Sequence, residues 1–445
     1  MMRLAETAID KALKLNATEA EAYVQKTQMT MVEYTEQIET FKTIKSIGMG
    51  LRVALGKRTA MYSTSVLNER EVIEAAEKAV KIAKVAPEDP CWKHFNRKFG
   101  KTPVEGTYDP KVEKIEHEEI VEALLTSISL LKKRDSRVKP TRGILVLATS
   151  DVTVADSNHE QNEGKQTGVS VQFTAKIAES GMESTGNEHQ ESRFWKEIDF
   201  NNVATNAADK AIKFLNSRSM KGGKMQIIFK NQIFANLLGI FIGPAISADW
   251  VQKGRSPLIG KMGTNIASEN VTITDDGTLR GGWGTSSFDD EGYPTQRTSI
   301  IEKGTLRNYI YDTYTALKAN AESTGNAQRP GYWLKPQPSP SNLVFKNGDE
   351  KPEEMIKDMK SGIYVDTTIG EWLSNPVSGN LNATITHGYL VEKGELTKPV
   401  KGLVISGNFF DLLKTGVRSI GNDLKNSGED YSPTVEITGL TVAGE

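Results

Sequence analysis

Two histidine–glutamate pairs come closer to a metal-ligand motif than other residues of this sequence. They begin the stretches HEEIVEAL at His117 and HEQNEG at His159. In a zincin helix, a second histidine follows one turn later, so that both imidazoles face one metal ion. Here the corresponding residues are Val121 and Glu163. We therefore interpret His117 and His159 as solvated surface residues.

A second set of reactive side chains lies in the acidic stretch TDDGTLRGGWGTSSFDDEGYPTQR, at 274–297. Carboxylate oxygens suit hard cations such as calcium. Aspartate beside glycine is also a common turn former, because its side chain bonds the backbone of a tight loop. We favour turns and keep a cation site as the alternative. The acidic residues concerned are Asp275, Asp276, Asp289, Asp290 and Glu291.

Cys91 is the only cysteine, and His94 stands three residues after it. Catalytic cysteine–histidine pairs are normally assembled from distant parts of a chain, so we interpret this neighbourhood as accidental. A single cysteine also excludes an intramolecular disulfide framework. The sequence has no Gly-x-Ser-x-Gly elbow and no Walker-type phosphate loop. Residue types alone therefore identify no catalytic centre.

The apolar stretch Phe234–Ile246 is not a membrane segment. It is 13 residues long, whereas a spanning helix needs about 20 apolar residues. The N-terminus lacks the apolar core of a signal peptide. The net charge is −2 and no run of five or more basic residues occurs, which argues against direct binding to nucleic acid. We expect a cytoplasmic protein that contacts neither membrane nor nucleic acid.

The elements that must position these residues follow one pattern twice in the first half. Helical spacing of apolar residues predicts helices over 2–15, 68–86, about 113–133 and about 200–216. Alternation predicts strands over 20–37, 48–65, 142–156 and 168–180, the second splitting at Gly56-Lys57. Residues 158–167 and 180–192 are expected to be polar connectors.

These elements predict an α+β protein, because antiparallel hairpins lie beside helices. We divide it into an N-terminal α/β repeat (1–88), a second α/β repeat (110–218) and a β-rich domain (222–445). The N-terminal half thus consists of two helix/antiparallel-sheet repeats, and the C-terminal domain is β-dominated with short helices. Proline and glycine mark 86–110 as a linker. Two hairpins with Lys-Gly turns are predicted at 300–312 and 389–402.

The C-terminal half resembles the TldD/PmbA family, whose PmbA branch is also called TldE. The stretches that carry the resemblance span roughly 225–445 in the family's order: SSFDDEGYPTQRTSIIEKGTLRNYIYDTYTA, AESTGNAQR, SGIYV, GYLVEKGELTKPVKG, ISGNFFDLLKTGVRSIGNDL and TVEITGLTVAGE. The N-terminal half has the family's length and style of repeat.

The resemblance implies one of two kinds of chain. TldD-type members resemble metalloproteases, with a His-Glu-x-x-x-His helix upstream of an Asp-Asp-Gly-Thr segment and a cysteine near the C-terminus. PmbA-type members lack these ligands and pair with a TldD-type chain, and the complex degrades or trims small unfolded peptides. The family is also described as a modulator of DNA gyrase. For this chain we interpret that link as indirect, through degradation of a gyrase-directed peptide.

Counting back from Asp275-Asp276-Gly277-Thr278 without a gap places the zinc motif on 239–244. Gly239 stands at the first histidine, Ile240 at the glutamate and Pro244 at the second histidine. None can bind zinc, and isoleucine cannot act as a general base. The stretch NDLKNSGEDYSPTVEITG also contains no cysteine.

The resemblance therefore implies a vacated zinc site, with no metal or cofactor in this chain and zinc only in a TldD-like partner. We expect the apolar helix 237–246 to pack on neighbouring strands and Pro244 to kink or end it.

Three hypotheses follow. The first is a non-catalytic subunit that forms a heterodimer or a higher hetero-oligomer with a TldD-like zinc subunit and helps hold an unfolded peptide. The alternative is a peptide-binding or scaffolding homodimer without a protease partner. The third is an enzyme with a cation held by Asp289, Asp290 and Glu291. Candidate peptide contacts are Asp289, Asp290, Glu291, Arg297, Asn326, Arg329, Asn422 and Asp423. For each of them we favour a turn or domain-contact role over direct contact with a peptide.

Overall fold

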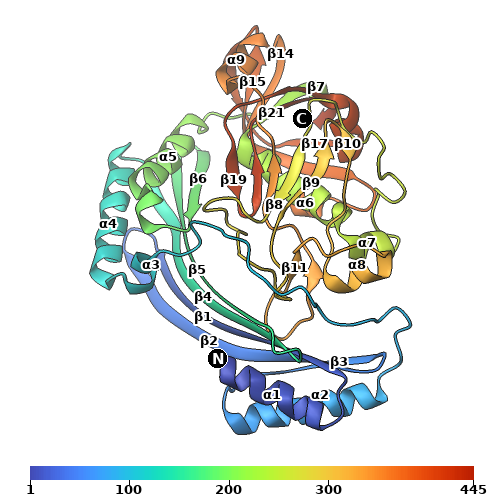
Figure 1. The fold of residues 1–445 in the computed structure, drawn as a ribbon. Helices are drawn as coiled ribbons and strands as arrows, with labels where there is room; N and C mark the ends of the chain where they lie inside the picture. The colour runs from blue at the N-terminus through green and yellow to red at the C-terminus, as the bar shows by residue number, and fades with distance from the viewer. Residues whose placement is uncertain (445) are drawn as a thin grey trace.

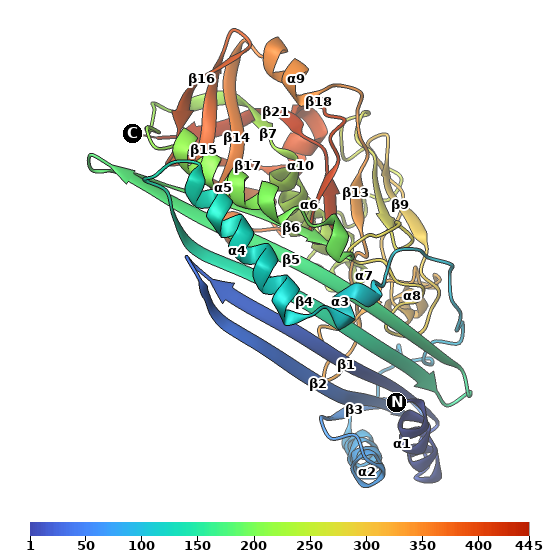
Figure 2. The ribbon, with the colours of Figure 1, turned by 90° about the vertical axis from the view of Figure 1, so that its left-hand side faces the viewer.

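The first half of the chain forms one long curved sheet, and the second half rests on one face of it (Figures 1 and 2). The structure is a computed structural model that describes residues 1–444. The sheet is antiparallel, with the order β3-β2-β1-β4-β5-β6. Its strands are β1 (Glu19–Tyr34), β2 (Ile38–Leu55), β3 (Arg58–Thr64), β4 (Lys139–Asp156), β5 (Gln161–Glu179) and β6 (Met182–Ser192).

The two predicted repeats share this sheet, because β1 pairs with β4 from Glu21↔Asp156 to Tyr34↔Gly143. The boundary predicted at 88–110 therefore lies between two halves of one sheet. Residues 86–109 contain neither helix nor strand. They run across to the C-terminal half, where Gly100 N–H donates to Gly292 O at 3.2 Å and Thr102 N–H to Ser287 O at 2.8 Å.

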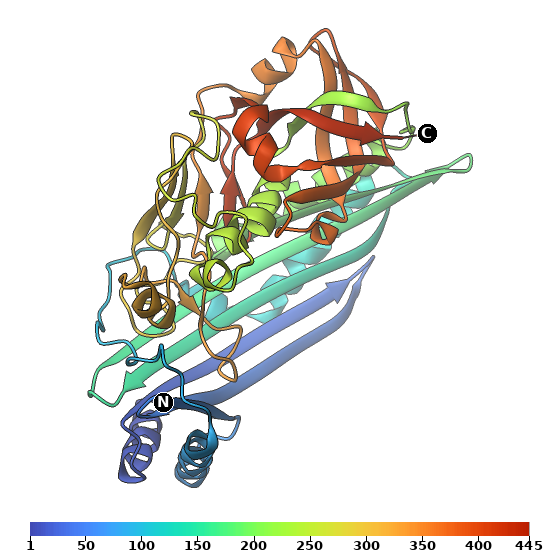
Figure 3. The same cartoon turned by 90° about the vertical axis from the view of Figure 1, so that its right-hand side faces the viewer.

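The period-two alternation of strand β1 separates the two faces of the sheet. Val24 packs with the first pair of helices and Val32 with the second pair, so both pairs cover the same face. Glu21 and Tyr23 point to the opposite face, toward the C-terminal half. The helices on this face are α1 (Met2–Lys14), α2 (Glu69–Val85), α3 (Pro110–Lys114), α4 (His117–Lys133) and α5 (Phe200–Lys213). Figure 3 shows the C-terminal half on the other face of the sheet.

The predicted polar connectors at 158–167 and 180–192 are correct only for 158–160 and 180–181, which join the strands, and wrong for the rest. Strand β5 already begins at Gln161, and residues 182–192 form strand β6. Residues 182–192 are polar because β6 is an edge strand that contacts other parts of the chain through hydrogen bonds and ion pairs instead of an apolar core. In β5, Asn162 likewise donates hydrogen bonds to Gly100 O and Gly292 O, in segments far from it along the chain. A polar edge strand lacks the alternation of apolar and polar residues that indicates a half-buried strand in a sequence.

The C-terminal half is β-rich with short helices, as predicted. One sheet has the order β10-β9-β8-β13-β20-β19, and the other β14-β7-β21-β17-β15-β16. The strands of the first sheet are β8 (Ile273–Asp276), β9 (Arg297–Glu302), β10 (Thr305–Leu306), β13 (Leu343–Phe345), β19 (Lys425–Ser427) and β20 (Asp430–Ser432). Those of the second are β7 (Gly223–Phe229), β14 (Ser361–Ile369), β15 (Asn380–Glu392), β16 (Glu395–Val400), β17 (Leu403–Asn408) and β21 (Val435–Ala443).

Smaller elements complete the C-terminal half. β18 (Val417–Ile420) pairs with β21, and β11 (Ala327–Gln328) pairs with β12 (Gln337–Pro338). Both Lys-Gly hairpins are confirmed, with Gly304 at φ 78° and Gly394 at φ 83°. The short helices are α7 (Ala248–Gln252), α8 (Thr313–Ala319), α9 (Pro352–Asp358) and α10 (Phe409–Asp411), with single turns at η2 (Glu371–Leu373) and η3 (Leu412–Gly416). A further turn, η1 (Trp195–Glu197), lies in the first half, between β6 and α5.

Helix α6 (Asn231–Ile246) is the central helix of the C-terminal half. It is apolar on most sides, as expected of a buried helix, and Phe234, Leu238 and Phe241 are fully buried among strands of both sheets. The helix continues two residues beyond Pro244 and ends at Ile246. No helix within residues 1–444 has the length and apolar character needed to cross a membrane.

A buried ion network joins the sheet to the C-terminal half. Arg52 of β2 donates to Glu21 of β1, directly opposite in register, at 2.9 Å, and to Glu291 at 2.8 Å. Arg329 also donates to Glu21. These four side chains are 9% exposed or less. Burial alone would lower the pKa of Arg52, but the charges of Glu21 and Glu291 raise it. Every charge in the network has an opposite partner.

We expect Arg52→Met to lower the free energy of unfolding by about 3–5 kcal/mol, because it leaves Glu291 with an uncompensated buried charge and Glu21 with Arg329 alone. Denaturant unfolding of the full chain would measure this. Arg297→Met is the matched control, since that side chain is 69% exposed and its loss should change stability by no more than about 0.5 kcal/mol. Equal stabilities for the two variants would contradict the role given to the network.

Candidate functional site

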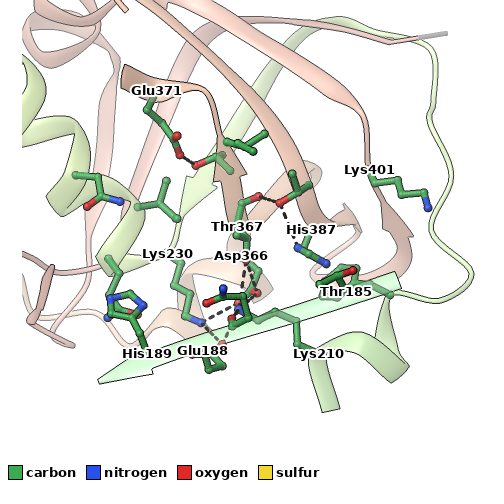
Figure 4. A pocket seen from close by; sticks show the side chains of 18 of the residues that line it. Thr185, Glu188, His189, Lys210, Lys230, Asp366, Thr367, Glu371, His387 and Lys401 are labelled. Carbon is green, nitrogen blue, oxygen red and sulfur yellow. Dashed lines mark hydrogen bonds and ion pairs between the residues drawn. The ribbon is translucent and has the colours of Figure 1, made fainter. Parts of the chain in front are cut away.

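A cavity of about 930 Å³ lies where the edge of the long sheet meets the C-terminal half (Figure 4). One wall is strand β6 with helix α5, and it includes Thr185, Asn187 and Lys210. The opposite wall consists of α6, β14 and β15, and includes Ile240 and His387. Such a space between two halves of a chain is a common place for a ligand site.

The edge of β6 presents main-chain carbonyls to this cavity. Lys401 Nζ donates to Glu183 O at 3.3 Å, and Lys210 Nζ donates to Asn187 O at 3.3 Å. The His387 imidazole hydrogen-bonds the main chain of Thr185, between them. Alternate residues of a strand direct their carbonyls to the same edge. Residues 183, 185 and 187 therefore form a row of acceptors along an unpaired strand edge.

Two lysines and two carboxylates form the charged floor of the cavity (Figure 4). Lys210 of α5 pairs with Glu188 of β6 at 2.5 Å and with Asp366 of β14 at 2.8 Å. Lys230, between β7 and α6, pairs with Asp366 at 2.9 Å. Burial alone would raise the pKa of Asp366, but Lys210 and Lys230 together hold it well below its usual range. The floor is thus an ionised, charge-balanced network that bridges the two halves of the chain.

Two histidines of the cavity are held neutral. Burial, with a smaller contribution from the charge of Lys210, lowers the pKa of His387 to about 4. Burial also lowers the pKa of His189. At neutral pH each imidazole can donate one hydrogen bond and accept another without carrying charge. With Lys210 and Lys230 committed to carboxylates, the cavity is suited to holding a polar main chain by hydrogen bonds.

The positions of the expected zinc motif lie on the exposed stripe of α6. Asn236, Gly239 and Ile240 are half-exposed and line the cavity, whereas the rest of this part of the helix is buried. Pro244 lines an adjoining cavity of about 510 Å³. Residues spaced three and four apart share one helix face, so Gly239, Ile240 and Pro244 look into the space between the two halves.

These residues do not fit a zinc ion. Their side chains offer no nitrogen, oxygen or sulfur donor. A Cβ atom on Gly239 would lie 2.0 Å from Asp430 Oδ2, so the Asp430 carboxylate occupies the space that a ligand at 239 would need. Burial, together with Glu429, raises the pKa of Asp430 to about 8. Within residues 1–444, no three His, Cys, Asp or Glu side chains lie close enough to hold a metal ion.

Three of the candidate peptide contacts lie around a further cavity of about 340 Å³, which is lined by Asp289, Asp290 and Arg329. Asp289 accepts hydrogen bonds from three main-chain N–H groups, among them Ala327 N–H at 3.0 Å. Asp290 accepts from Arg329 N–H at 2.6 Å. Glu291 belongs to the buried network. A turn accounts for the local bonds of Asp289, whereas Asp290 and Glu291 bond segments far apart in the chain. A direct peptide contact stays a prediction.

The other candidates are dispersed. Asn326 is buried and donates to Asp275 at 2.6 Å. Burial raises the pKa of Asp275 to about 7. Asp423 accepts from Asn231 Nδ2 at 2.9 Å, at the start of α6.

Arg297 and Asn422 are exposed. Arg297 lies 3.7 Å from Asp276, and Asn422 N–H donates to Glu350 O at 2.8 Å. The eight candidates therefore form no single site.

Sequence reasoning missed the residues that form the floor of the cavity. Lys210, Lys230 and Asp366 are ordinary residue types that lie far apart in the chain and in separate elements. His189 and His387 carried a weak signal, since the chain has five histidines and these two lie within strands. Only the docking of the C-terminal half against β6 and α5 brings all five together.

The chain is similar to one family along most of its length. Two family models match: "PmbA/TldA metallopeptidase C-terminal domain" over residues 222–444 and "PmbA/TldA metallopeptidase domain 1" over residues 20–83. The uncharacterized protein MJ0231 of Methanocaldococcus jannaschii is 29% identical over 405 residues, 91% of each chain. Metalloprotease PmbA of Escherichia coli O157:H7 is 24% identical over 452 residues, covering 100% of this chain and 97% of that one. The structure of TldE from Thermococcus kodakarensis has the same fold, with a TM-score of 0.91, 23% identity, and coverage of 99% of this chain and 100% of that one.

We expect stability to fall as the pH is lowered from 6.5 to about 4, and His387→Gln to remove part of that fall. The unfolded imidazole binds a proton near pH 6.5, whereas the folded one binds it only near 4. In this window the unfolded state binds more protons, so lowering the pH favours unfolding. Denaturant unfolding at a series of pH values would measure it.

His159→Asn provides the control. His159 is exposed and has φ 64°, a conformation that asparagine tolerates, so this variant should keep the wild-type pH dependence. A His387→Gln variant with the same pH dependence as the wild type would contradict the assignment of a neutral, buried His387.

Proposed function

This chain belongs to the PmbA/TldD metallopeptidase family, and we propose that it is a non-catalytic subunit that holds an unfolded peptide for a zinc-bearing TldD-type partner. The observation that carries the proposal is the exposed stripe of α6. The family's ligand positions look into the space between the two halves of the chain, but they carry Gly239, Ile240 and Pro244. A position that faces a ligand and has lost its catalytic side chains is suited to binding without chemistry.

The packing around Gly239 supports the proposal that this chain holds no zinc. A metal ligand needs a cavity and further side chains that orient it. Here the Asp430 carboxylate stands where the side chain of residue 239 would begin. The neighbouring positions of α6 pack into the apolar core, with Leu238 and Phe241 fully buried. Zinc and the general base would then come from the partner chain alone.

The edge of β6 supports the peptide-holding part. An extended peptide can add to a sheet edge through main-chain hydrogen bonds, which gives affinity with little sequence preference. The carbonyls of Glu183, Thr185 and Asn187 lie in the required row and are bonded by side chains that a peptide N–H could replace. Lys401 is flexible and would swing aside, whereas Lys210 stays paired with Glu188 and Asp366. Asn187 O could accept a peptide N–H beside Lys210, because a carbonyl oxygen has two lone pairs.

The first test is cleavage of an unstructured peptide by three samples: this chain, a TldD-type chain from the same organism, and the two mixed. We expect cleavage to reach its full rate only in the mixture, and a chelator to abolish it. This chain alone should cleave nothing, because it lacks zinc ligands and a general base. Zinc measured in this chain by itself should be far below one equivalent. Cleavage by this chain alone would overturn the proposal. A mixture no faster than the TldD-type chain would favour the peptide-binding homodimer.

A second test uses one peptide with methyl groups on its consecutive central amides, compared with the same number of methyl groups on its terminal amides. Loss of two or three main-chain bonds, at about 0.5–1.5 kcal/mol each, should weaken binding about tenfold or more for the central set. Fluorescence anisotropy with the isolated chain would measure both. Equal affinities would show that the peptide does not bind as an added strand.

A further inference from the structure

The rim of the cavity carries apolar side chains that are unusually exposed. Ile369, at the end of β14, is 50% exposed, and Trp372 and Leu373 of η2 are 67% and 75% exposed. Ile369 and Trp372 line the same cavity as the β6 edge. Clustered exposed apolar residues on a protein surface mark a binding site more often than isolated ones do.

The turn that presents Trp372 is held firmly from below. Glu371 is only 6% exposed and accepts a hydrogen bond from the Thr368 hydroxyl. Leu373 N–H donates to Gly370 O at 2.9 Å, and Gly370 has φ 90°, a conformation that favours glycine. The indole is therefore mounted on a fixed turn, as expected of a side chain that receives a ligand without a large loss of conformational entropy.

Helix α6 supplies the facing part of the wall. The η2 turn packs against α6, and Ile240 on the exposed stripe of that helix lines the cavity with Ile369 and Trp372. Ile240 is half-exposed, unlike the buried Leu238 and Phe241 beside it. The residue that stands at the glutamate position of the zinc motif therefore contributes apolar surface to the cavity.

We propose that Ile240, Ile369 and Trp372 form a subsite for a large apolar side chain of the bound peptide, an inference that rests on the peptide-holding function proposed above. The occupant follows from continuity with the β6 edge. Alternate side chains of a strand added to β6 point to the face of the sheet on which the C-terminal half lies, and α6 and η2 form the wall there.

Main-chain hydrogen bonds give little sequence preference, and the subsite would explain how the protein still selects unfolded segments. Large apolar side chains are mostly buried in folded proteins and exposed in unfolded ones. A site that needs both a free strand backbone and a free apolar side chain is closed to a folded protein.

The test compares two dye-labelled peptides that differ only in having leucine or serine at alternate positions. Burying one or two leucine side chains on a partly open wall should favour the leucine peptide about tenfold, at 1.4 kcal/mol per tenfold. Trp372→Ala combined with Ile369→Ser should bring the two affinities to within about twofold. Ile240→Glu should also reduce the preference, because it places a charge in the apolar wall.

Trp333→Ala is the matched control. Trp333 is 54% exposed but does not line the cavity, so its loss should leave the preference unchanged. Tryptophan emission provides a second measurement. The leucine peptide should shift it to shorter wavelength in the wild type, and the shift should be much smaller in Trp372→Phe.

The outcomes separate the two proposals. Equal affinity of the wild type for both peptides, or a preference untouched in the Trp372→Ala/Ile369→Ser variant, would overturn the subsite and leave peptide binding standing. A variant that binds peptides normally but no longer assembles with a TldD-type chain would also overturn it, since the patch would then be a subunit interface. A wild type that binds neither peptide would overturn both the subsite and the peptide-holding function.

Discussion

The buried network of Glu21, Arg52, Glu291 and Arg329 is the interaction on which the arrangement of the two halves depends. Two of its members are neighbours on β1 and β2, and two come from loops of the C-terminal half. Isolated charges at this depth would cost several kcal/mol each, and only mutual pairing offsets that cost. The network therefore tolerates one relative placement of the halves, because a shifted placement would leave charges unpaired.

The cavity is a consequence of that placement. The long sheet ends at β6, and the C-terminal half approaches the β6 edge without pairing its own strands to it. Lys210, Lys401 and His387 bond the edge instead. An unpaired strand edge can pair with another chain, and covering it is one way of preventing unwanted pairing. Here the cover consists of side chains over a cavity, which leaves the edge available to a peptide small or extended enough to enter.

Helix α6 combines a buried apolar packing surface with a cavity-facing stripe that carries no metal-donor side chain at 239, 240 or 244. The buried sides of the helix still pack between the two C-terminal sheets through Phe234, Leu238 and Phe241. The cavity-facing stripe is free of that packing constraint, and there the chain carries Gly239, Ile240 and Pro244. Asp430 fills the space above Gly239. A stripe without donor side chains is suited to contact alone, in keeping with the proposed division of work between two subunits.

Much of the architecture was determined by local sequence pattern. The helices over 2–15 and 68–86, the Gly56-Lys57 turn and both Lys-Gly hairpins were predictable, because helix periodicity and turn chemistry act between near neighbours. The absence of donors at 239, 240 and 244 was likewise readable from residue types, once the resemblance supplied the spacing.

Tertiary structure decided the rest. Strand β6 has no apolar alternation, so only its pairing with β5 makes it a strand. Lys210, Lys230, Asp366 and His387 are separated along the chain and form a site only because the halves dock. Whether an acidic residue such as Asp289 or Glu291 contacts a ligand or holds a turn is set by burial and partners, and these arise from the packing of segments far apart in sequence.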